Sequence, residues 1–326
     1  MSKLTLSRGL NEGLRKALEN DPKVLIMGED VGKLGGVFRV TDGLQKDFGE
    51  ARVIDTPLAE SGIVGTAIGL ALRGYRPVCE IQFDGFVFPA FDQIVSQLAK
   101  MRYRSRGQVA LPIVIRIPFG GGIGAVEHHS ESPEALFAHT PGLRVVACSN
   151  AADAFTMIQQ SVSSDDPVIF FEPKRRYWDK AEVDPAGLAN ALPFDRARVA
   201  VEGTDVTLLC YGPLVRTALE AAAAAREDGR SIEVIDLRSL SPLDIDVITA
   251  SVRKTGRCVV THEAPVYAGL GAEIAARVTE QCFYHLEAPV LRVGGFSIPY
   301  PPSRLEDHYL PDLDRILDAV DRTFGY

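Results

Sequence analysis

Hydrophobic positions along the first half of the chain alternate between helical and extended spacing. Leu6, Leu10, Leu14 and Leu18 recur every four residues and predict a helix with one apolar face. Short apolar runs bounded by turn residues have the length of buried strands. The pattern predicts strands at 24–27, 53–55, 77–83, 111–117, 143–148 and 168–171, and helices at 5–20, 61–73, 89–104, 133–139 and 151–163. This order is typical of an α/β fold, in which crossover helices cover a mostly parallel sheet.

The periodicity lapses between Pro173 and Pro193 and then starts again. The intervening sequence is charged and contains Pro and Gly, so we interpret it as a connection between domains. Beyond it the pattern predicts strands at 206–211, 232–237, 258–262 and 290–293, and helices at 214–227, 245–254, 271–281 and 312–324. We therefore expect two α/β domains, 1–180 and 196–326, joined by a linker at 181–195.

Composition and charge narrow the classes of function. The chain has 326 residues, 46% of them hydrophobic and 24% charged, which suits a folded protein with two cores. Its net charge of −8 argues against a nucleic-acid partner, because phosphate binding needs clustered Lys and Arg. The basic run Lys174–Arg176 is short, and we expect it to be a solvated loop. No apolar stretch is long enough to span a bilayer and no signal-peptide pattern opens the chain, so we predict a cytoplasmic protein without a membrane partner.

Five cysteines lie singly along the chain, four of them inside apolar runs. They form no C-x-x-C pair and no even framework. We interpret them as small buried hydrophobes rather than zinc ligands or disulfides.

Two glycine-rich turns, Gly120–Gly124 and Gly269–Gly271, invite comparison with phosphate-binding loops. The first opens no helix, and the second lacks the third glycine of the G-x-G-x-x-G pattern. Nicotinamide binding is therefore not favoured.

One carboxylate, Glu60, lies between a predicted strand end at Asp55 and a helix of small residues. Open α/β sheets hold their ligands at this edge, at the carboxyl ends of the strands. From the pattern alone, the commoner explanation is an acid at a helix N-terminus, which the helix dipole favours.

His128 and His129 follow the first glycine-rich turn, in a loop well placed for proton transfer near neutral pH. No partner occurs at zinc-ligand spacing, and a surface histidine without function stays open. Four phenylalanines between 83 and 91 cluster at a strand-to-helix connection. Core packing is their usual role, and a cofactor platform is the alternative.

Taken together, these segments resemble the β subunit of heterotetrameric, thiamine diphosphate-dependent 2-oxo acid dehydrogenases, the decarboxylating first component of multienzyme complexes. The resemblance covers essentially the whole chain. Its marks are IMGEDV (26–31), GGVF (35–38), RVIDTPLAE (52–60), EIQF (80–83), FPAFDQI (88–94), HSESPEA (129–135) and FFEP (170–173). It implies a pyrimidine-binding α/β domain followed by a domain similar to the transketolase C-terminal domain.

The resemblance also implies that this chain binds the aminopyrimidine end of thiamine diphosphate. Glu60 matches the glutamate at N1′ of the pyrimidine, where a carboxylate favours the imino tautomer that removes the C2 proton of the thiazolium. Phe86 matches an aromatic ring against the pyrimidine, and Leu58 and Gln82 match neighbours that line the cofactor. His129 matches a loop histidine that protonates or orients the intermediate during acyl transfer to a lipoyl arm. His128 matches no functional position.

Members of the family hold the diphosphate through magnesium and a Gly-Asp-Gly motif, and this chain contains no Gly-Asp-Gly. Magnesium needs carboxylate or amide oxygens beside the phosphates. The resemblance therefore implies that an α subunit supplies these ligands, in an α2β2 assembly with active sites at the interfaces.

Many members also bind a structural potassium ion, and its positions correspond here to Ile113, Ser161, Val162, Ser164 and Asp166. Ser164 stands where Asp is common, and Asp166 stands where Asn is common. Backbone carbonyls could still coordinate the ion, so the resemblance implies potassium as a further ligand.

The implied activity is oxidative decarboxylation of a 2-oxo acid and transfer of the acyl group to the lipoyl group of an acyltransferase core. Residues 80–93 and 130–139 are most similar to the branched-chain subfamily. We therefore favour 3-methyl-2-oxobutanoate as substrate, with pyruvate and then acetoin as alternatives.

Two other interpretations stay open. The chain could be a non-catalytic docking subunit, because its acidic C-terminal helix at 312–324 suits a basic subunit-binding domain. It could instead be a self-sufficient thiamine enzyme, which the chain length and the missing diphosphate motif oppose.

Overall fold

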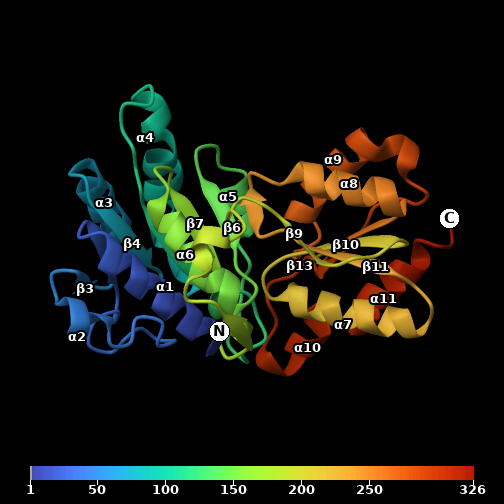
Figure 1. Cartoon of the computed structure of the whole chain (residues 1–326), viewed down its shortest axis with the longest axis horizontal. Coiled ribbons are helices and arrows are strands. Elements are labelled where there is room, and N and C mark those ends of the chain that lie inside the picture. Colours follow the sequence, from blue (N-terminus) through green and yellow to red (C-terminus); the bar gives the residue numbers. More distant parts are fainter. Residues whose placement is uncertain (1) are drawn as a thin grey trace.

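Seven strands form the first sheet of this protein, in a computed structural model that describes residues 2–326 (Figure 1). Their order is β12-β6-β7-β5-β4-β2-β3, and every neighbouring pair except β12 and β6 is parallel. The strands are β2 (Val24–Gly28), β3 (Val53–Asp55), β4 (Arg76–Glu80), β5 (Val114–Phe119), β6 (Arg144–Ala147), β7 (Val168–Pro173) and β12 (Ser239–Ser241). The helical segments of this domain are α1 (Leu6–Asn20), α2 (Leu44–Phe48), α3 (Glu60–Leu72), η1 (Asp84–Ala90), η2 (Gln93–Leu98), α4 (Ala99–Arg104), η3 (Glu127–His129), α5 (Glu134–Ala138), α6 (Ala151–Ser163) and η4 (Lys174–Arg176).

Both faces of this sheet are buried. Successive residues of a strand point to opposite faces. Ile26 and Val78 pack in the core that contains α1 and α6, whereas Met27 and Cys79 pack in the core that contains α3. A parallel sheet covered on both sides needs nearly continuous apolar strands, which is why short apolar runs revealed them in the sequence.

The second domain is built on a five-stranded sheet with the order β14-β13-β10-β11-β9, in which only β9 is antiparallel to its neighbour. Its strands are β9 (Arg198–Val201), β10 (Val206–Cys210), β11 (Ile232–Asp236), β13 (Cys258–Pro265) and β14 (Leu291–Gly295). Its helical segments are α7 (Leu214–Glu227), α8 (Ile245–Thr255), α9 (Leu270–Cys282), η6 (Phe283–His285), η7 (Ser303–Leu305), α10 (Glu306–Tyr309) and α11 (Leu313–Arg322).

The expected α/β fold is confirmed, and the differences in detail come from pairings between distant segments. β1 (Ser2–Thr5) pairs with β8 (Lys180–Val183), so a strand lies inside the segment that we expected to be a linker, which also contains η5 (Gly187–Asn190). β12 belongs to the second half of the chain but pairs with β6 in the first sheet. The helix expected at 89–104 overlaps the end of η1, continues as the π-helical η2 and becomes α-helical only in α4. Local periodicity cannot report a pairing partner that lies in a distant part of the chain.

The solvated loop expected at Lys174–Arg176 is wrong. Lys174 is only 2% exposed and forms an ion pair with Asp84. Arg175 pairs with Glu263 at 2.6 Å, and Arg176 donates to the backbone oxygen of Pro213 at 3.0 Å. The basic run is therefore part of the interior and of the boundary between the domains.

Two other expectations concern the whole chain. All five cysteines are buried, which confirms their interpretation as small apolar residues. Within residues 2–326, the structure contains no helix with the length and apolar character needed to cross a membrane.

A fully buried arginine, Arg116, joins the three central strands of the first sheet. From β5 it donates to Glu80 of β4 at 2.6 Å and to both carboxylate oxygens of Glu172 on β7, at 2.6 and 2.9 Å. Tyr177 also donates to Glu172, at 2.6 Å. Burial opposes the charge on Arg116, but Glu172 and Glu80 outweigh it and raise the pKa of the guanidinium.

The glycine-rich loop 120–124 meets the second domain through backbone hydrogen bonds. The Gly121 N–H donates to Glu263 Oε2 at 2.9 Å. The N–H groups of Gly122 and Gly124 donate to the two carboxylate oxygens of Glu306, at 3.0 and 2.9 Å. Two acids of the second domain thus bind the amide groups that a phosphate-binding loop would offer to its ligand.

We predict that Arg116→Met lowers the free energy of unfolding by about 3–5 kcal/mol, because two carboxylates stay buried without their cation. Urea unfolding followed by circular dichroism measures the change. The exposed Arg216 is the control, since Arg216→Ala removes only surface ion pairs and should cost about 1 kcal/mol or less. An Arg116→Met chain as stable as the parent would contradict the assigned role of the buried network.

Candidate functional site

Glu60 is the first residue of α3 and is nearly buried, with 6% of the residue exposed. It follows the carboxyl end of β3, which Thr56 ties to β2 by donating to the Gly28 carbonyl at 2.9 Å. Glu29 comes directly after β2 at the same edge. Burial, followed by the charges of Glu60 and Asp30, raises the pKa of Glu29, so these acids lie close together. Glu60 therefore belongs to an acidic cluster at the ligand-binding edge of the sheet.

Gln82 connects this acidic cluster to the turn after β4. Its side-chain amide donates to Asp30 Oδ2 at 3.1 Å and to the Glu29 carbonyl at 3.5 Å. Leu58, two residues before Glu60, is 80% exposed. An apolar side chain this exposed beside a polar cluster suits a surface that a ligand or a partner covers.

The histidine loop packs on the same turn. The ring centroid of His129 lies 4.0 Å from that of Phe83 and 5.2 Å from that of Phe86. His128 lies at the outer side, 6.0 Å from Phe86. Since α3 packs against η1, the helix that begins at Glu60 adjoins the segment that carries Phe86. The segment Gln82–Phe86 therefore joins the acidic cluster to the histidines.

His129 is in an environment that favours the neutral imidazole. Burial, then the neighbouring His128 and then the Lys174 ammonium lower its pKa below the ordinary value of 6.5. Its Nδ1 atom is buried without a hydrogen-bond partner. A neutral imidazole can accept a proton at neutral pH, as a general base does.

The chain fits the pyrimidine half of thiamine diphosphate better than the diphosphate half. Glu60 offers a nearly buried carboxylate and Phe86 a half-buried ring on adjoining elements. By contrast, the amide groups of the glycine-rich loop are already bound to Glu263 and Glu306. In residues 2–326 no group of three or more His, Cys, Asp or Glu side chains forms a metal-binding cluster.

The positions implied for potassium gather around the end of α6, but their oxygens have other partners. The Arg76 guanidinium donates to the backbone oxygens of Val162 at 3.0 Å and of Ser164 at 3.1 Å. The carboxylate of Asp166 pairs with two arginines, and the Ile113 carbonyl accepts the Val168 N–H at 2.9 Å. The hydroxyl of Ser161 is buried without a partner. The Ser161 hydroxyl is thus free to bind an ion, whereas the carbonyls of Val162 and Ser164 already accept hydrogen bonds from Arg76.

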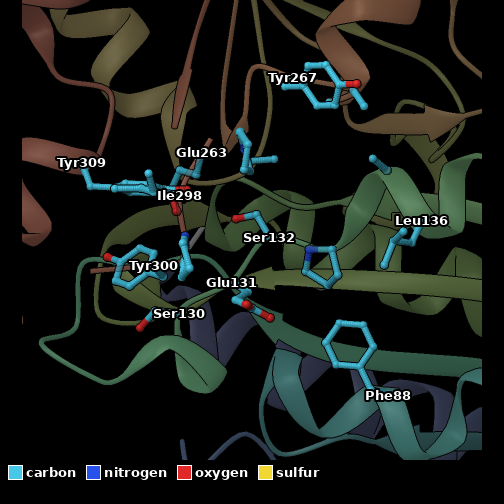
Figure 2. A pocket seen from close by; sticks show the side chains of 17 residues that line it. Phe88, Ser130, Glu131, Ser132, Leu136, Glu263, Tyr267, Ile298, Tyr300 and Tyr309 are labelled. Carbon is cyan, nitrogen blue, oxygen red and sulfur yellow. The ribbon is translucent and has the colours of Figure 1, made fainter. Parts of the chain in front are cut away.

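A cavity of about 260 Å³ borders the histidine loop at the boundary between the domains (Figure 2). Glu131 and Ser132, which follow His129 in the chain, line it from the first domain. Glu263 and Tyr300 line it from the second domain, as Figure 2 shows. The loop that carries His129 is therefore shared between the candidate site and an interdomain space.

Comparisons with known proteins agree with this architecture. The family model for the transketolase pyrimidine-binding domain matches residues 2–179, and the model for the transketolase C-terminal domain matches residues 195–316. A solved structure titled "Split gene transketolase, inactive beta4 tetramer" is similar over 99% of this chain and 98% of its own, with a TM-score of 0.81 and 23% identity. At that identity the likeness shows the fold, which defines a transketolase-like protein of two α/β domains.

Two curated relatives define the family further. The chain is 62% identical to the pyruvate dehydrogenase E1 component subunit beta of Leifsonia xyli subsp. xyli, over 99% of this chain and 95% of that protein. It is 54% identical to the 3-methyl-2-oxobutanoate dehydrogenase subunit beta of Mycobacterium tuberculosis (strain ATCC 25618 / H37Rv), over 98% and 91%. The chain belongs to the β subunits of the 2-oxo acid dehydrogenases, in the decarboxylating first component.

Three residues around the site were not recognised from the sequence. Glu29 stands directly after a strand at the ligand-binding edge, a position that could have marked it as a second acid. Asp84 and Lys174 form a buried ion pair beneath the histidine loop. Their pairing joins positions 90 residues apart, so no local pattern could have revealed it.

We predict that His128→Asn raises the pKa of His129, because the substitution removes one of the neighbouring charges that oppose its protonation. Diethyl pyrocarbonate modifies the unprotonated imidazole, so the pH dependence of modification at His129, followed by peptide mass spectrometry, measures the pKa. The midpoint should move to higher pH. His139→Asn is the control, and an unchanged midpoint in His128→Asn would contradict the electrostatic explanation.

Proposed function

We propose that this chain supplies the pyrimidine half of a thiamine diphosphate site, with Glu60 as the carboxylate that hydrogen-bonds N1′. The nearly buried position of Glu60 at the carboxyl edge of the sheet, beside Glu29 and next to the Gln82–Phe86 segment, carries this proposal. When bound, thiamine diphosphate supplies the electron sink that decarboxylation of a 2-oxo acid requires. In this proposal Glu60 holds a proton in a hydrogen bond with N1′ of the pyrimidine.

The remaining residues of the site have supporting parts in this proposal. The half-buried ring of Phe86 stacks on the pyrimidine, and Leu58 and Gln82 line the cofactor. His129, kept neutral by its surroundings, moves a proton during transfer of the acyl group to a lipoyl arm.

Because this chain offers only the pyrimidine part of the cofactor site, other subunits must complete it. We propose that an α subunit supplies the magnesium ligands and the diphosphate contacts in an α2β2 assembly, and that a lipoyl acyltransferase core receives the acyl group. Support comes from the occupied amide groups of the glycine-rich loop and from the names of the relatives, which are those of β subunits. Potassium at the end of α6 is part of the proposal, with the unused Ser161 hydroxyl as its support.

We propose 3-methyl-2-oxobutanoate as the preferred substrate, with pyruvate as the second candidate. The similarity of residues 80–93 and 130–139 to the branched-chain subfamily and the relative from Mycobacterium tuberculosis support the first. The relative from Leifsonia xyli, named for pyruvate, supports the second. The site is shared with an α subunit, whose residues also shape the substrate pocket.

Glu60→Gln tests the catalytic proposal. It keeps the size of the side chain but removes the carboxylate, so we expect decarboxylation to fall by about 100-fold or more while the complex still assembles. Activity with the α subunit present and size-exclusion chromatography measure the two properties. The exposed Glu220→Gln serves as the control. Unchanged turnover with intact assembly would favour a docking subunit without a catalytic role.

The substrate proposal is tested by co-expression with the α subunit. We expect kcat/KM for 3-methyl-2-oxobutanoate to exceed that for pyruvate by about 10-fold or more, since added apolar contacts of this size are worth about 1–3 kcal/mol. A preference for pyruvate would overturn the branched-chain proposal without affecting the role of Glu60.

A further inference from the structure

The turn after β4 and the first residues of η1 support the loop that carries His129. The ring centroid of His129 lies 4.0 Å from that of Phe83 and 5.2 Å from that of Phe86. A Cβ atom at Gly85 would collide with the backbone carbonyl of His128. The turn therefore fits the loop closely, and only glycine allows this approach.

Asp84, the first residue of η1, binds both the histidine loop and a buried lysine. One carboxylate oxygen, Oδ2, accepts the N–H of Glu131 at 2.7 Å, two residues after His129. The other, Oδ1, forms the ion pair with Lys174. Asp84 and Lys174 are 0% and 2% exposed, so the pair excludes water. Burial raises the pKa of Asp84 to about 6 in spite of Lys174, which leaves the carboxylate ionised at neutral pH.

Lys174 also lies behind the ring that contacts His129. Its Nζ atom is 5.7 Å from the centroid of Phe83, the ring whose centroid lies 4.0 Å from that of His129. The other charged or titratable groups around His129 are His128 and Glu127 on its own loop, Asp84 on η1, and Glu131. Glu127 favours the protonated imidazole, whereas His128 and Lys174 oppose it.

We propose that Asp84 and Lys174 are positioning residues for His129. The carboxylate holds the histidine loop through the Glu131 N–H, and the ammonium keeps that carboxylate in place and acts on His129 through Phe83. The proposal rests on the acyl-transfer role proposed for His129. It adds two residues that do not touch the reacting atoms but determine where His129 lies and in which protonation state.

Buried ion pairs often do no more than hold a fold together, and apolar replacements of similar size are frequently tolerated. The two explanations differ in what a neutral pair would change. A purely structural pair would leave the protonation of His129 unaltered. A positioning pair would alter it even in a folded, assembled enzyme.

The test uses two double variants in the complete complex with its α subunit. Asp84→Asn with Lys174→Met removes both charges but keeps an oxygen that can accept the Glu131 N–H. Asp84→Ala with Lys174→Met removes that acceptor as well. Asp153→Asn is the matched control, because Asp153 of α6 is 5% exposed, pairs with Arg198 and Arg238, and lies on a different element from the histidine loop.

The first measurement is the pH dependence of diethyl pyrocarbonate modification at His129. The first double variant removes the Asp84 carboxylate together with the Lys174 ammonium. The charges that act most on His129 are those of His128, Lys174 and Glu127, so the loss of the ammonium decides the sign and the midpoint should move to higher pH. The control should leave it unchanged. This measurement does not depend on catalysis, so it stays decisive even if His129 has no part in acyl transfer.

The second measurement separates the two half-reactions. We expect the rate of acylation of a free lipoyl domain to fall by about 10- to 100-fold in the second double variant, because displacing a catalytic group by about 1 Å has effects of this size. Decarboxylation measured with an artificial electron acceptor should fall by a clearly smaller factor, because neither substitution changes Glu60. The same variants are compared by thermal denaturation.

An unshifted modification midpoint in the first double variant overturns the electrostatic part of the proposal. Equal losses in both half-reactions, in step with lower thermal stability, overturn positioning in favour of a structural role. His129→Gln with undiminished lipoyl acylation contradicts the proposed function of His129 alone, and the modification midpoints then decide the positioning of its side chain.

Discussion

A single buried cation, Arg116, sets the geometry on which the candidate site depends. Its two carboxylate partners stand at the carboxyl ends of β4 and β7, immediately before the segments that carry Gln82 and Lys174. Buried ion pairs gain little net stability over apolar packing, but they tolerate little displacement, because each charge loses its partner when it moves. The network therefore fixes the points from which the turn and the basic segment leave the sheet.

From these fixed points the chain builds two environments of opposite character. At the ends of β2 and β3, Glu29 and Glu60 share a nearly buried edge in which like charges crowd. Beyond Gln82, aromatic rings and a buried ammonium surround His129 and favour its uncharged form. Burial and neighbouring charges thus raise the pKa of Glu29 and lower that of His129, and acid–base chemistry at one pH uses groups whose pKa values are shifted apart. The segment Gln82–Phe86 lies between these two environments.

The order of helices and strands could be predicted from the sequence because each element buries a local apolar pattern. Glu60 and His129 could be proposed from the sequence because they lie within motifs of the family, one after a strand end and the other in a loop. The burial of Lys174 could not be found, since its sequence neighbours are basic and its partner Asp84 is distant. The same holds for the glycine-rich loop, where the absence of a phosphate fingerprint was evident but the carboxylates that bind it, Glu263 and Glu306, come from the other domain.

The contacts across the domain boundary bear on how such a chain can change over evolution. Separate family models match residues 2–179 and 195–316, which suggests parts that could be exchanged. Yet β12 of the second half completes the first sheet, and acids of the second half bind the amides of loop 120–124. A recombination event at the linker would leave a sheet edge and a row of amides without partners. The chain matches two separate family models, but the hydrogen bonds between its halves mean that neither half can be replaced without losing contacts of the other.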